Sequence, residues 1–265
     1  MDTHRTDRVM ATVSGVLDPY VERGDVAGLA WTVVLGDELV QGAAGVPVDA
    51  VFRIASISKP FVAVLALQLV EDGRIGLDDP VDLFLPELAD RRVLVDPHGP
   101  IDSPTEPARR PITLRDLLTF RLGLGMDFDF SSPQPVLDEM NALGVGVGPT
   151  APEMTPDEYL LRLGRLPLAH HPGDRWLYHT GSDVVGVLVE RLVGRPLDEV
   201  LRDRLLDPLG LADTGFSVRP DQRDRCTVSR MGGEDGSMSD WDGVDGRWSA
   251  PPAFRSGATG LVSTA

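Results

Sequence analysis

The only lysine in this chain, Lys59, stands three residues after Ser56 in the segment Phe52-Arg-Ile-Ala-Ser-Ile-Ser-Lys-Pro60. Lysine and arginine together number 25, so the other 24 basic residues are arginine. In such a composition, a position that needs only positive charge is expected to hold arginine. A buried lysine can lose its proton, whereas arginine stays charged. The single lysine therefore indicates chemistry that needs a neutral amine.

The spacing of Ser56 and Lys59 suits one face of a helix. Residues three apart on a helix have Cβ atoms about 5 to 6 Å apart, so the two side chains would meet in a first helical turn. A free amine there could take the proton of Ser56, and the helix N-terminus would favour both the neutral amine and a developing alkoxide. This is the Ser-x-x-Lys arrangement of acyl-transfer enzymes. The alternative is that Ser56 caps the helix and Lys59 is solvated.

The elements around this pair are predicted by apolar patterns. Proline is tolerated in the first turn of a helix, and residues 61–70 are apolar on nearly every face, which predicts a buried central helix after Pro60. Before the pair, residues 28–35 and 38–44 flank a Gly-Asp turn and predict a β-hairpin.

Further helices and two polar stretches are predicted along the rest of the chain. Apolar residues at helical spacing predict four more helices, at residues 9–20, 113–119, 182–193 and 197–206. The Pro/Asp/Gly-rich residues 127–155 predict a surface lobe or lid, because such long loops are uncommon. Residues 219–250 are rich in Asp, Gly, Ser and Arg and predict an exposed connection.

Seven segments, in order over most of the chain, match the motifs of one known family. They are Phe52-Arg-Ile-Ala-Ser-Ile-Ser-Lys-Pro60, Leu69-Val-Glu-Asp-Gly-Arg-Ile-Gly-Leu-Asp-Asp-Pro-Val81, Ile112-Thr-Leu-Arg-Asp-Leu-Leu-Thr119, Pro172-Gly-Asp-Arg-Trp-Leu-Tyr178, Gly181-Ser-Asp-Val-Val-Gly186, Pro208-Leu-Gly-Leu-Ala-Asp-Thr-Gly-Phe216 and Gly260-Leu-Val-Ser-Thr-Ala265. The chain thus resembles the serine beta-lactamase-related hydrolases, which include class C beta-lactamases, D-Ala-D-Ala peptidases and beta-lactamase-like esterases. The resemblance implies an α+β fold of the beta-lactamase/transpeptidase type, an antiparallel sheet packed by helices plus a mostly helical lobe.

The resemblance also implies a catalytic set. Ser56 matches the acylated nucleophile, Lys59 its proton partner, and Tyr178 the tyrosine of the family's Tyr-x-Asn motif, a second acid and base. A phenol with a pKa near 10 beside a lysine can be held partly ionised. Without the Ser-x-x-Lys pair, a buried tyrosine beside Trp176 would be the preferred interpretation of Tyr178.

Two departures from the family pattern concern substrate binding and completeness. In Tyr178-His179-Thr180, either His179 or Thr180 replaces the family's asparagine, so both are candidate substrate-binding residues with altered preference. The family's third motif, Lys-Thr-Gly or His-x-Gly, is missing, and in the family a helix and three strands follow the position of Ala265. We therefore expect a truncated chain whose sheet is incomplete and whose oxyanion hole keeps only the Ser56 N–H.

One domain is expected over residues 1–265. Within it, residues 1–55 would form the N-terminal helix and hairpin of the sheet part. Residues 56–218 would form the helical part that carries Ser-x-x-Lys and the tyrosine motif. Residues 219–265 would form an exposed connection and the start of the C-terminal part.

Composition limits the partners. The formal net charge of −16 and the isoelectric point near 4.6 argue against nucleic acid and anionic membranes, and leave small neutral esters or amides as substrates. The single Cys226 excludes an internal disulfide. The N-terminal residues show no signal peptide, and no apolar stretch is long enough to span a membrane, so a cytoplasmic protein is expected. The oligomeric state is left open.

No cofactor is expected, and metal binding is disfavoured. His170, His171 and Asp174 lie close in the sequence, but adjacent histidines point in different directions and no third ligand is suitably spaced. The glycine-rich residues 122–125 and 256–260 match no phosphate-binding loop.

Three functions follow from these features. The first is a serine hydrolase that acts through an acyl-enzyme on small esters or amides, in particular a beta-lactamase-like esterase. The second is a beta-lactamase or a D-Ala-D-Ala carboxypeptidase-like enzyme, which the expected location and the missing asparagine disfavour. The third is an inactive, truncated relative that serves as a binding or vestigial module, which the missing third motif favours.

Overall fold

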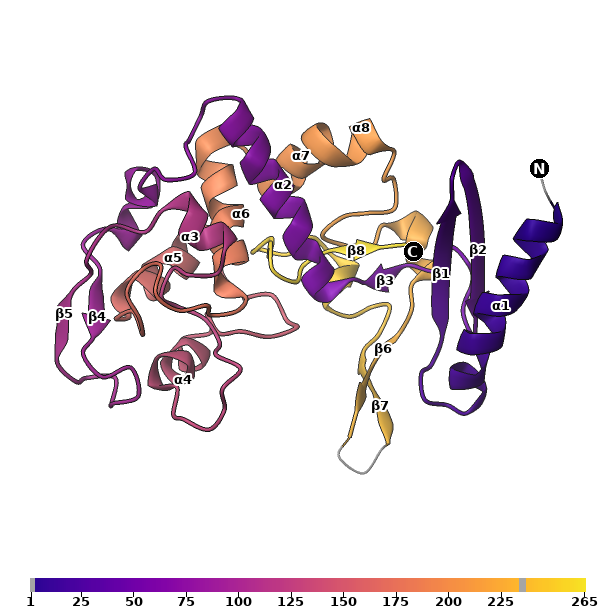
Figure 1. The fold of residues 1–265 in the computed structure, drawn as a ribbon, viewed down its shortest axis with the longest axis horizontal. Coiled ribbons are helices and arrows are strands. Elements are labelled where there is room, and N and C mark those ends of the chain that lie inside the picture. The colour runs from indigo at the N-terminus through magenta and orange to yellow at the C-terminus, as the bar shows by residue number, and fades with distance from the viewer. Residues whose placement is uncertain (1–2, 234–236) are drawn as a thin grey trace. The chain divides into compact units, whose positions relative to one another are not determined.

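The computed structural model describes residues 3–233 and 237–265, which form two compact units (Figure 1). Unit 1 comprises Met1–Arg53, Asp213–Pro251 and Val262–Ala265, and unit 2 comprises Ile54–Ala212 and Pro252–Leu261. Each unit is therefore assembled from segments that are distant in the sequence. The single domain expected over residues 1–265 stays a prediction.

Unit 1 begins with a helix and a hairpin. Helix α1 (Thr3–Glu22) packs against strand β2 (Glu38–Ala44), which pairs antiparallel with β1 (Leu29–Leu35). Trp31 of β1 and Val40 of β2 are buried, as the alternation of a half-buried strand requires. The predicted N-terminal helix and hairpin are thus confirmed.

The rest of unit 1 consists of short elements around a small core. Strand β3 (Phe52–Arg53) pairs with β8 (Val262–Ser263), and β6 (Ser229–Gly232) pairs with β7 (Met238–Asp242). Two 3₁₀ turns complete it, η5 (Pro220–Arg225) and η6 (Arg247–Ser249). The core cluster comprises Val51, Val218, Trp248 and Val262.

The stretch predicted as an exposed connection, residues 219–250, is more structured than expected. Strands β6 and β7 are largely exposed, but Trp248 is 5% exposed and Gln222 is 1% exposed. Gln222 is held because its side-chain oxygen accepts from the Arg219 N–H at 2.8 Å. Buried anchors that are isolated in a polar stretch leave no periodicity in the sequence.

Unit 2 is built on two apolar helices that pack together, α2 (Ser58–Glu71) and α6 (Thr180–Val193) (Figure 1). Helix α2 ends at Glu71, and Gly73 just beyond it has φ of 68°, the left-handed conformation that commonly closes a helix. The close approach between α6 and α3 needs Gly181, because a Cβ there would lie 2.3 Å from the Leu117 carbonyl oxygen. The predicted central helix and the helix at 182–193 are confirmed.

Shorter elements surround this pair of helices. They are η1 (Ala55–Ile57), η2 (Val81–Leu83), η3 (Pro86–Leu88), the antiparallel strands β4 (Arg92–Leu94) and β5 (Thr105–Pro107), α3 (Leu114–Leu118), α4 (Pro135–Ala142), α5 (Pro156–Arg165), α7 (Leu197–Leu201), the π-helical turn η4 (Arg202–Leu206) and α8 (Asp207–Leu209). Helix α3 is fixed by a capping box between Thr113 and Asp116.

Two features of unit 2 differ from expectation. The predicted excursion at 127–155 contains α4, whose Val136 and Met140 are buried. The single helix predicted at 197–206 changes into a π-helical turn at Arg202.

The strands form four separate antiparallel pairs among the described residues. Together with the helices, they confirm the α+β class. Within the described part of the chain, no helix combines the length and the apolar character needed to cross a bilayer.

Candidate active site

Ser56 and Lys59 meet at the start of α2, as their spacing predicts. Ser56 lies in the turn η1 with an exposed side chain, and Lys59 in the first turn of α2 is 8% exposed. Lys59 Nζ lies 2.9 Å from Ser56 Oγ, within hydrogen-bond distance. The residue before the serine, Ala55, has φ of 45°, a left-handed conformation that is unfavourable for a residue with a Cβ.

The Lys59 amine is enclosed by two further groups. Its Nζ donates to the Ala258 carbonyl oxygen at 2.8 Å and lies 4.5 Å from the centre of the Tyr178 ring. Burial lowers the pKa of Lys59, while hydrogen bonding to Tyr178 and the charges of Tyr178 and Asp183 partly oppose this shift. The enclosure therefore favours the neutral amine that a proton acceptor needs.

Tyr178 is the third member of this arrangement. Its backbone exchanges two hydrogen bonds with Met126, of 2.8 and 3.1 Å. Burial would raise the pKa of the Tyr178 phenol, but hydrogen bonding to Ser56 and Lys59 and the charge of Lys59 outweigh burial and lower it. The structure thus brings three of the predicted residues, Ser56, Lys59 and Tyr178, into one cluster.

His179 and Thr180 follow Tyr178 but are buried, at 4% and 1% exposure. His179 has φ of 85° and ψ of −63°, and the Thr180 N–H donates to the Tyr178 carbonyl oxygen at 3.2 Å. These values define a γ-turn of the rare, strained kind. His179 Nε2 lies 3.5 Å from a carboxylate oxygen of Asp183, and Thr180 Oγ1 has no hydrogen-bond partner among the described residues. Their role in substrate binding stays a prediction.

The segment 256–261 also contributes to the site. This contribution was not predicted from the sequence. It supplies the Ala258 carbonyl to Lys59, and its Leu261 N–H donates to Ser58 Oγ at 3.0 Å. Gly257 allows the close approach to α6, because a Cβ there would lie 2.5 Å from the Ser182 carbonyl oxygen. A contact made by a backbone carbonyl cannot be predicted from residue type. The small residues of Ser256-Gly-Ala-Thr-Gly260 were the one feature of the sequence that could have indicated a close approach here.

A cavity of about 340 Å³ opens beside Ser56. Apart from Ser56, Lys59 and Ser182, its lining is apolar: Pro60, Val62, Ala63, Leu117, Leu118, Phe120 and Val185. Pockets for small ligands are commonly of this size and this apolar character.

An aromatic cluster adjoins Tyr178, with Phe120, Phe128 and Trp176 in direct ring contact with it. The ring centres of Phe120, Phe128 and Trp176 lie 5.5 to 5.8 Å from that of Tyr178. Phe128 and Trp176 also stack on each other and are 54% and 42% exposed. Exposed stacked rings beside a nucleophile provide a flat apolar surface for a ligand.

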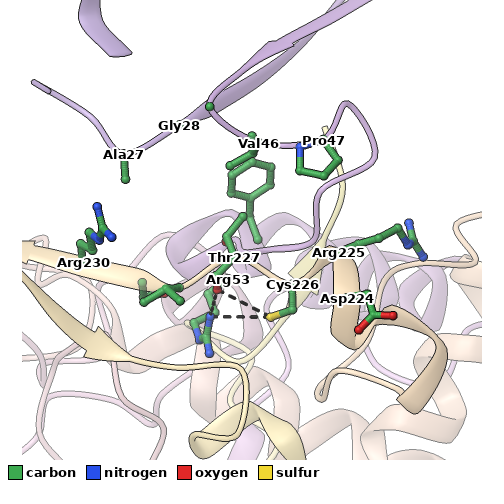
Figure 2. A pocket seen from close by; sticks show the side chains of 14 residues that line it. Ala27, Gly28, Val46, Pro47, Arg53, Asp224, Arg225, Cys226, Thr227 and Arg230 are labelled. Carbon is green, nitrogen blue, oxygen red and sulfur yellow. Dashed lines mark hydrogen bonds between the residues drawn. The ribbon is translucent and has the colours of Figure 1, made fainter. Parts of the chain in front are cut away.

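A second cavity, of about 380 Å³, lies within unit 1 (Figure 2). Arg53 donates to the Thr227 carbonyl at 2.7 Å and contacts Cys226 Sγ at 4.0 Å, as the dashed lines in Figure 2 show. Because Asp242 already pairs with Arg53 at 2.6 Å, this cavity presents no unpaired charge from that arginine. Within residues 3–233 and 237–265, no group of three or more His, Cys, Asp or Glu side chains could hold a metal ion.

The fold and the site define an α+β protein of the beta-lactamase/transpeptidase type that carries a Ser-x-x-Lys pair at the start of its central helix. Sequence comparison agrees, since a family model described as Beta-lactamase matches residues 13–265. The chain belongs to the beta-lactamase family.

Named relatives include an esterase and a simvastatin synthase. The chain is 41% identical to protein Rv1367c of Mycobacterium tuberculosis, over 84% of this chain and 53% of that protein. It is 33% identical to esterase EstB of Burkholderia gladioli, over 82% of this chain and 55% of that protein. A mutant of simvastatin synthase LovD from Aspergillus terreus has a similar structure, with a TM-score of 0.73 and 28% identity over 96% of this chain and 63% of the other. The chain thus spans about half the length of the curated relatives it matches.

Proposed function

We propose that this chain is a serine hydrolase that acts through an acyl-enzyme on small esters. Ser56 is the nucleophile, and Lys59 and Tyr178 form the acid–base pair. The observation that carries the proposal is the 2.9 Å contact between Lys59 Nζ and Ser56 Oγ, with the same amine enclosed against the Tyr178 ring. The similarity to an esterase supports it. A cytoplasmic location stays a prediction.

The reaction follows from proton transfers within this cluster. The amine–phenol pair accepts the hydroxyl proton of Ser56 while Oγ adds to the carbonyl carbon of the ester. The bond from that carbon to the alcohol oxygen then breaks, and the alcohol leaves with the proton that the pair returns. A water molecule enters next, gives one proton to the pair and adds to the acyl carbon. Ser56 Oγ leaves with that proton, so that one ester and one water yield one acid and one alcohol.

The surroundings of the cluster favour an apolar ester as the substrate. The cavity beside Ser56 is lined mainly by aliphatic side chains, and stacked aromatic rings adjoin Tyr178. Apolar surfaces gain roughly 25 cal/mol for each Å² removed from water, so an apolar acyl group in the cavity would be bound favourably. We therefore propose esters with short apolar acyl chains in preference to cephalosporins or D-Ala-D-Ala peptides.

Fluorophosphonate labelling of the 265-residue chain, with mass spectrometry to locate the adduct, tests the reaction class. An adduct on Ser56 that is lost in Ser56→Ala is expected. A folded sample that gives no adduct, or an adduct at another residue, would refute the proposal in favour of an inactive relative. Faster turnover of a chromogenic cephalosporin than of a nitrophenyl ester would overturn the choice of esterase.

Filling the cavity tests the substrate class. Ala63→Phe places a ring among the lining residues, whereas Leu67→Phe places the same ring on the same helix at a position that is 47% exposed and outside the lining. We expect Ala63→Phe to lower kcat/KM for nitrophenyl butyrate at least tenfold and for the acetate much less, with Leu67→Phe close to the parent. Equal losses for both esters would contradict an acyl group in this cavity.

A further inference from the structure

Asp183 is a buried acid with incomplete pairing. It lies in the first turn of α6 and is 1% exposed. Its Oδ1 accepts from Ser256 Oγ at 2.6 Å and from the Ala258 N–H at 3.0 Å, while its Oδ2 has no hydrogen-bond partner among the described residues. Burying a carboxylate is costly unless it is fully paired, so such a group calls for a functional explanation.

One chain of contacts leads from Asp183 to the catalytic amine. The Ser256 hydroxyl that donates to Asp183 also accepts from the Thr259 N–H at 3.1 Å. That N–H belongs to the same peptide unit as the Ala258 carbonyl, which accepts from Lys59 at 2.8 Å. Asp183 therefore orients this peptide, and hydrogen bonds in such a series strengthen one another.

A second contact leads from the same carboxylate toward the catalytic phenol. His179 Nε2 lies 3.5 Å from Asp183 Oδ2, the oxygen that has no hydrogen-bond partner. His179 directly follows Tyr178 and is the central residue of the strained γ-turn. A side-chain attraction at that residue helps to hold a backbone conformation that costs of order 1–3 kcal/mol. Asp183 thus contacts residues that hold both Lys59 and Tyr178 in place.

We infer that Asp183 is a positioning residue that fixes Lys59, through Ser256 and the Ala258 peptide, and Tyr178, through His179. The inference rests on the proposed function, because it assigns Asp183 to the same reaction. Among the described residues, Asp183 has no hydrogen bond or ion pair with Ser56. Its influence reaches the reaction through the geometry and the charge that it imposes on the acid–base pair.

The charge of Asp183 provides a readout that packing alone would not move. It raises the pKa of Lys59 against the larger effect of burial. The other ionisable groups around these two residues are Tyr178, beside Lys59, and Tyr159 and His179, beside Asp183. When Asp183 becomes neutral, the pKa of Lys59 is therefore expected to fall further.

The test compares Asp183→Asn with Asp198→Asn. Both acids tie the segment 252–261 to a helix, but Asp198 pairs with Arg255 at 2.5 Å, whereas Asp183 accepts from the Ala258 N–H. Because the chain has one lysine, protein grown with ¹³C-labelled lysine shows a single Cε resonance whose titration reports Lys59. Turnover of nitrophenyl butyrate is measured alongside.

For Asp183→Asn we expect Lys59 to titrate at least half a pH unit lower and kcat to fall at least tenfold, while Asp198→Asn changes kcat less than twofold. Unchanged titration and turnover in Asp183→Asn would overturn the inference. If Asp183→Asn does not fold, Ser256→Ala removes the relay and keeps the acid. It should lower kcat several-fold without moving the titration, and full turnover there would also overturn the inference. The titration of Lys59 can be measured in an inactive protein. Failure of fluorophosphonate to label Ser56 in the parent would therefore refute the proposed hydrolase function independently of the inference about Asp183.

Discussion

At the scale of single residues, the proposed reaction depends on the coupled ionisation of Lys59 and Tyr178. The pKa of Lys59 is lowered mainly by burial, and that of Tyr178 is lowered by hydrogen bonding and by the lysine charge despite its burial. Since each group stabilises the other's charged form, the two titrate as a pair. The base form of this pair is therefore present at a lower pH than either side chain would give alone.

The pH dependence of turnover follows from these directions. The base form must accept the Ser56 proton, so kcat/KM should rise with pH along a limb centred below 10.0, the lower of the two ordinary pKa values. A pH series of nitrophenyl butyrate hydrolysis, corrected for the spontaneous reaction, measures the limb. A limb centred above 10 would show that the pair is not coupled as described.

Lys59→Arg separates charge from proton transfer. Arginine keeps the positive charge but cannot lose its proton, so turnover should fall at least a hundredfold while the fold persists. The matched control is Arg204→Lys, a conservative exchange in an ion pair with Asp72, which should leave turnover unchanged. Circular dichroism checks the folding of both variants. Activity retained by Lys59→Arg would assign Lys59 a structural role.

The sequence predicts the site residues whose side chains act in the proposed reaction, but it does not predict the contributions of backbone groups. Ser56, Lys59 and Tyr178 are predicted because their residue types and motifs are typical of proton transfer. The contact between Lys59 and the Ala258 carbonyl could not be predicted. Every residue has a backbone carbonyl, and Ala258 lies 199 positions from Lys59 in the sequence. Asp183 is an acid at the start of an apolar helix, which was only a weak indication of a role in the site. The γ-turn at His179 is imposed by its surroundings and leaves no pattern.

At the scale of elements, long apolar patterns were predictive and short pairings were not. Helices α2 and α6 have 14 residues each, enough for periodicity to show. Strands β3 and β8 have two residues each, and they pair although most of the chain separates them in the sequence. No local pattern could therefore predict them. The helix at 197–206 was predicted with regular spacing, but a π-helical turn intervenes and leaves both Leu205 and Leu206 buried.

Asp213 anchors the turn η5 of unit 1, and its neutralisation should weaken this contact. Its carboxylate accepts from both Arg225 nitrogens, at 2.8 and 2.9 Å, and from Gln222 at 3.0 Å. We expect Asp213→Asn to lower the free energy of unfolding by about 1 kcal/mol after allowance for solvent screening, measured by urea titration. Asp221→Asn, which breaks an exposed pair with Arg219, is the control and should change little.

The same carboxylate predicts an acid dependence. Hydrogen bonding from Arg225 holds the pKa of Asp213 well below its usual value of 3.8, against the opposing effect of burial. A lowered carboxylate pKa stabilises the fold above the ordinary value, and this contribution is lost as the pH falls through the lowered one. The difference between parent and Asp213→Asn should therefore persist at pH 6 and shrink below about pH 4. A difference independent of pH would contradict the assignment.

At the scale of the whole molecule, the two units differ in the size of their cores. Among the described residues of unit 1, the buried apolar ones are Trp31, Val40, Ala50, Val51, Phe216, Val218, Trp248 and Val262. Unit 2 buries the apolar faces of α2, α6 and most of the shorter helices. Since stability follows the apolar area removed from water, unit 1 is expected to be the less stable unit.

Hydrogen exchange followed by mass spectrometry tests this difference. Amides of β1 and β2 should exchange through openings of lower free energy than those of α2 and α6. Urea titration of Trp176→Phe gives a second measure, because its remaining tryptophans, Trp31, Trp241 and Trp248, all lie in unit 1. Equal protection of the strands and the two helices would mean that the chain unfolds as one cooperative body.

Backbone strain in this chain is concentrated next to the reacting groups. Among the described residues, four non-glycine residues have positive φ: Ala55, Asp90, Phe120 and His179. Ala55 precedes Ser56, Phe120 contacts the Tyr178 ring, and His179 follows that tyrosine. Selection for heat resistance would favour glycine at these positions, because glycine relieves a left-handed backbone. Laboratory evolution toward a sturdier protein would thus tend to relax the geometry on which turnover depends, and the two goals would compete at these three positions.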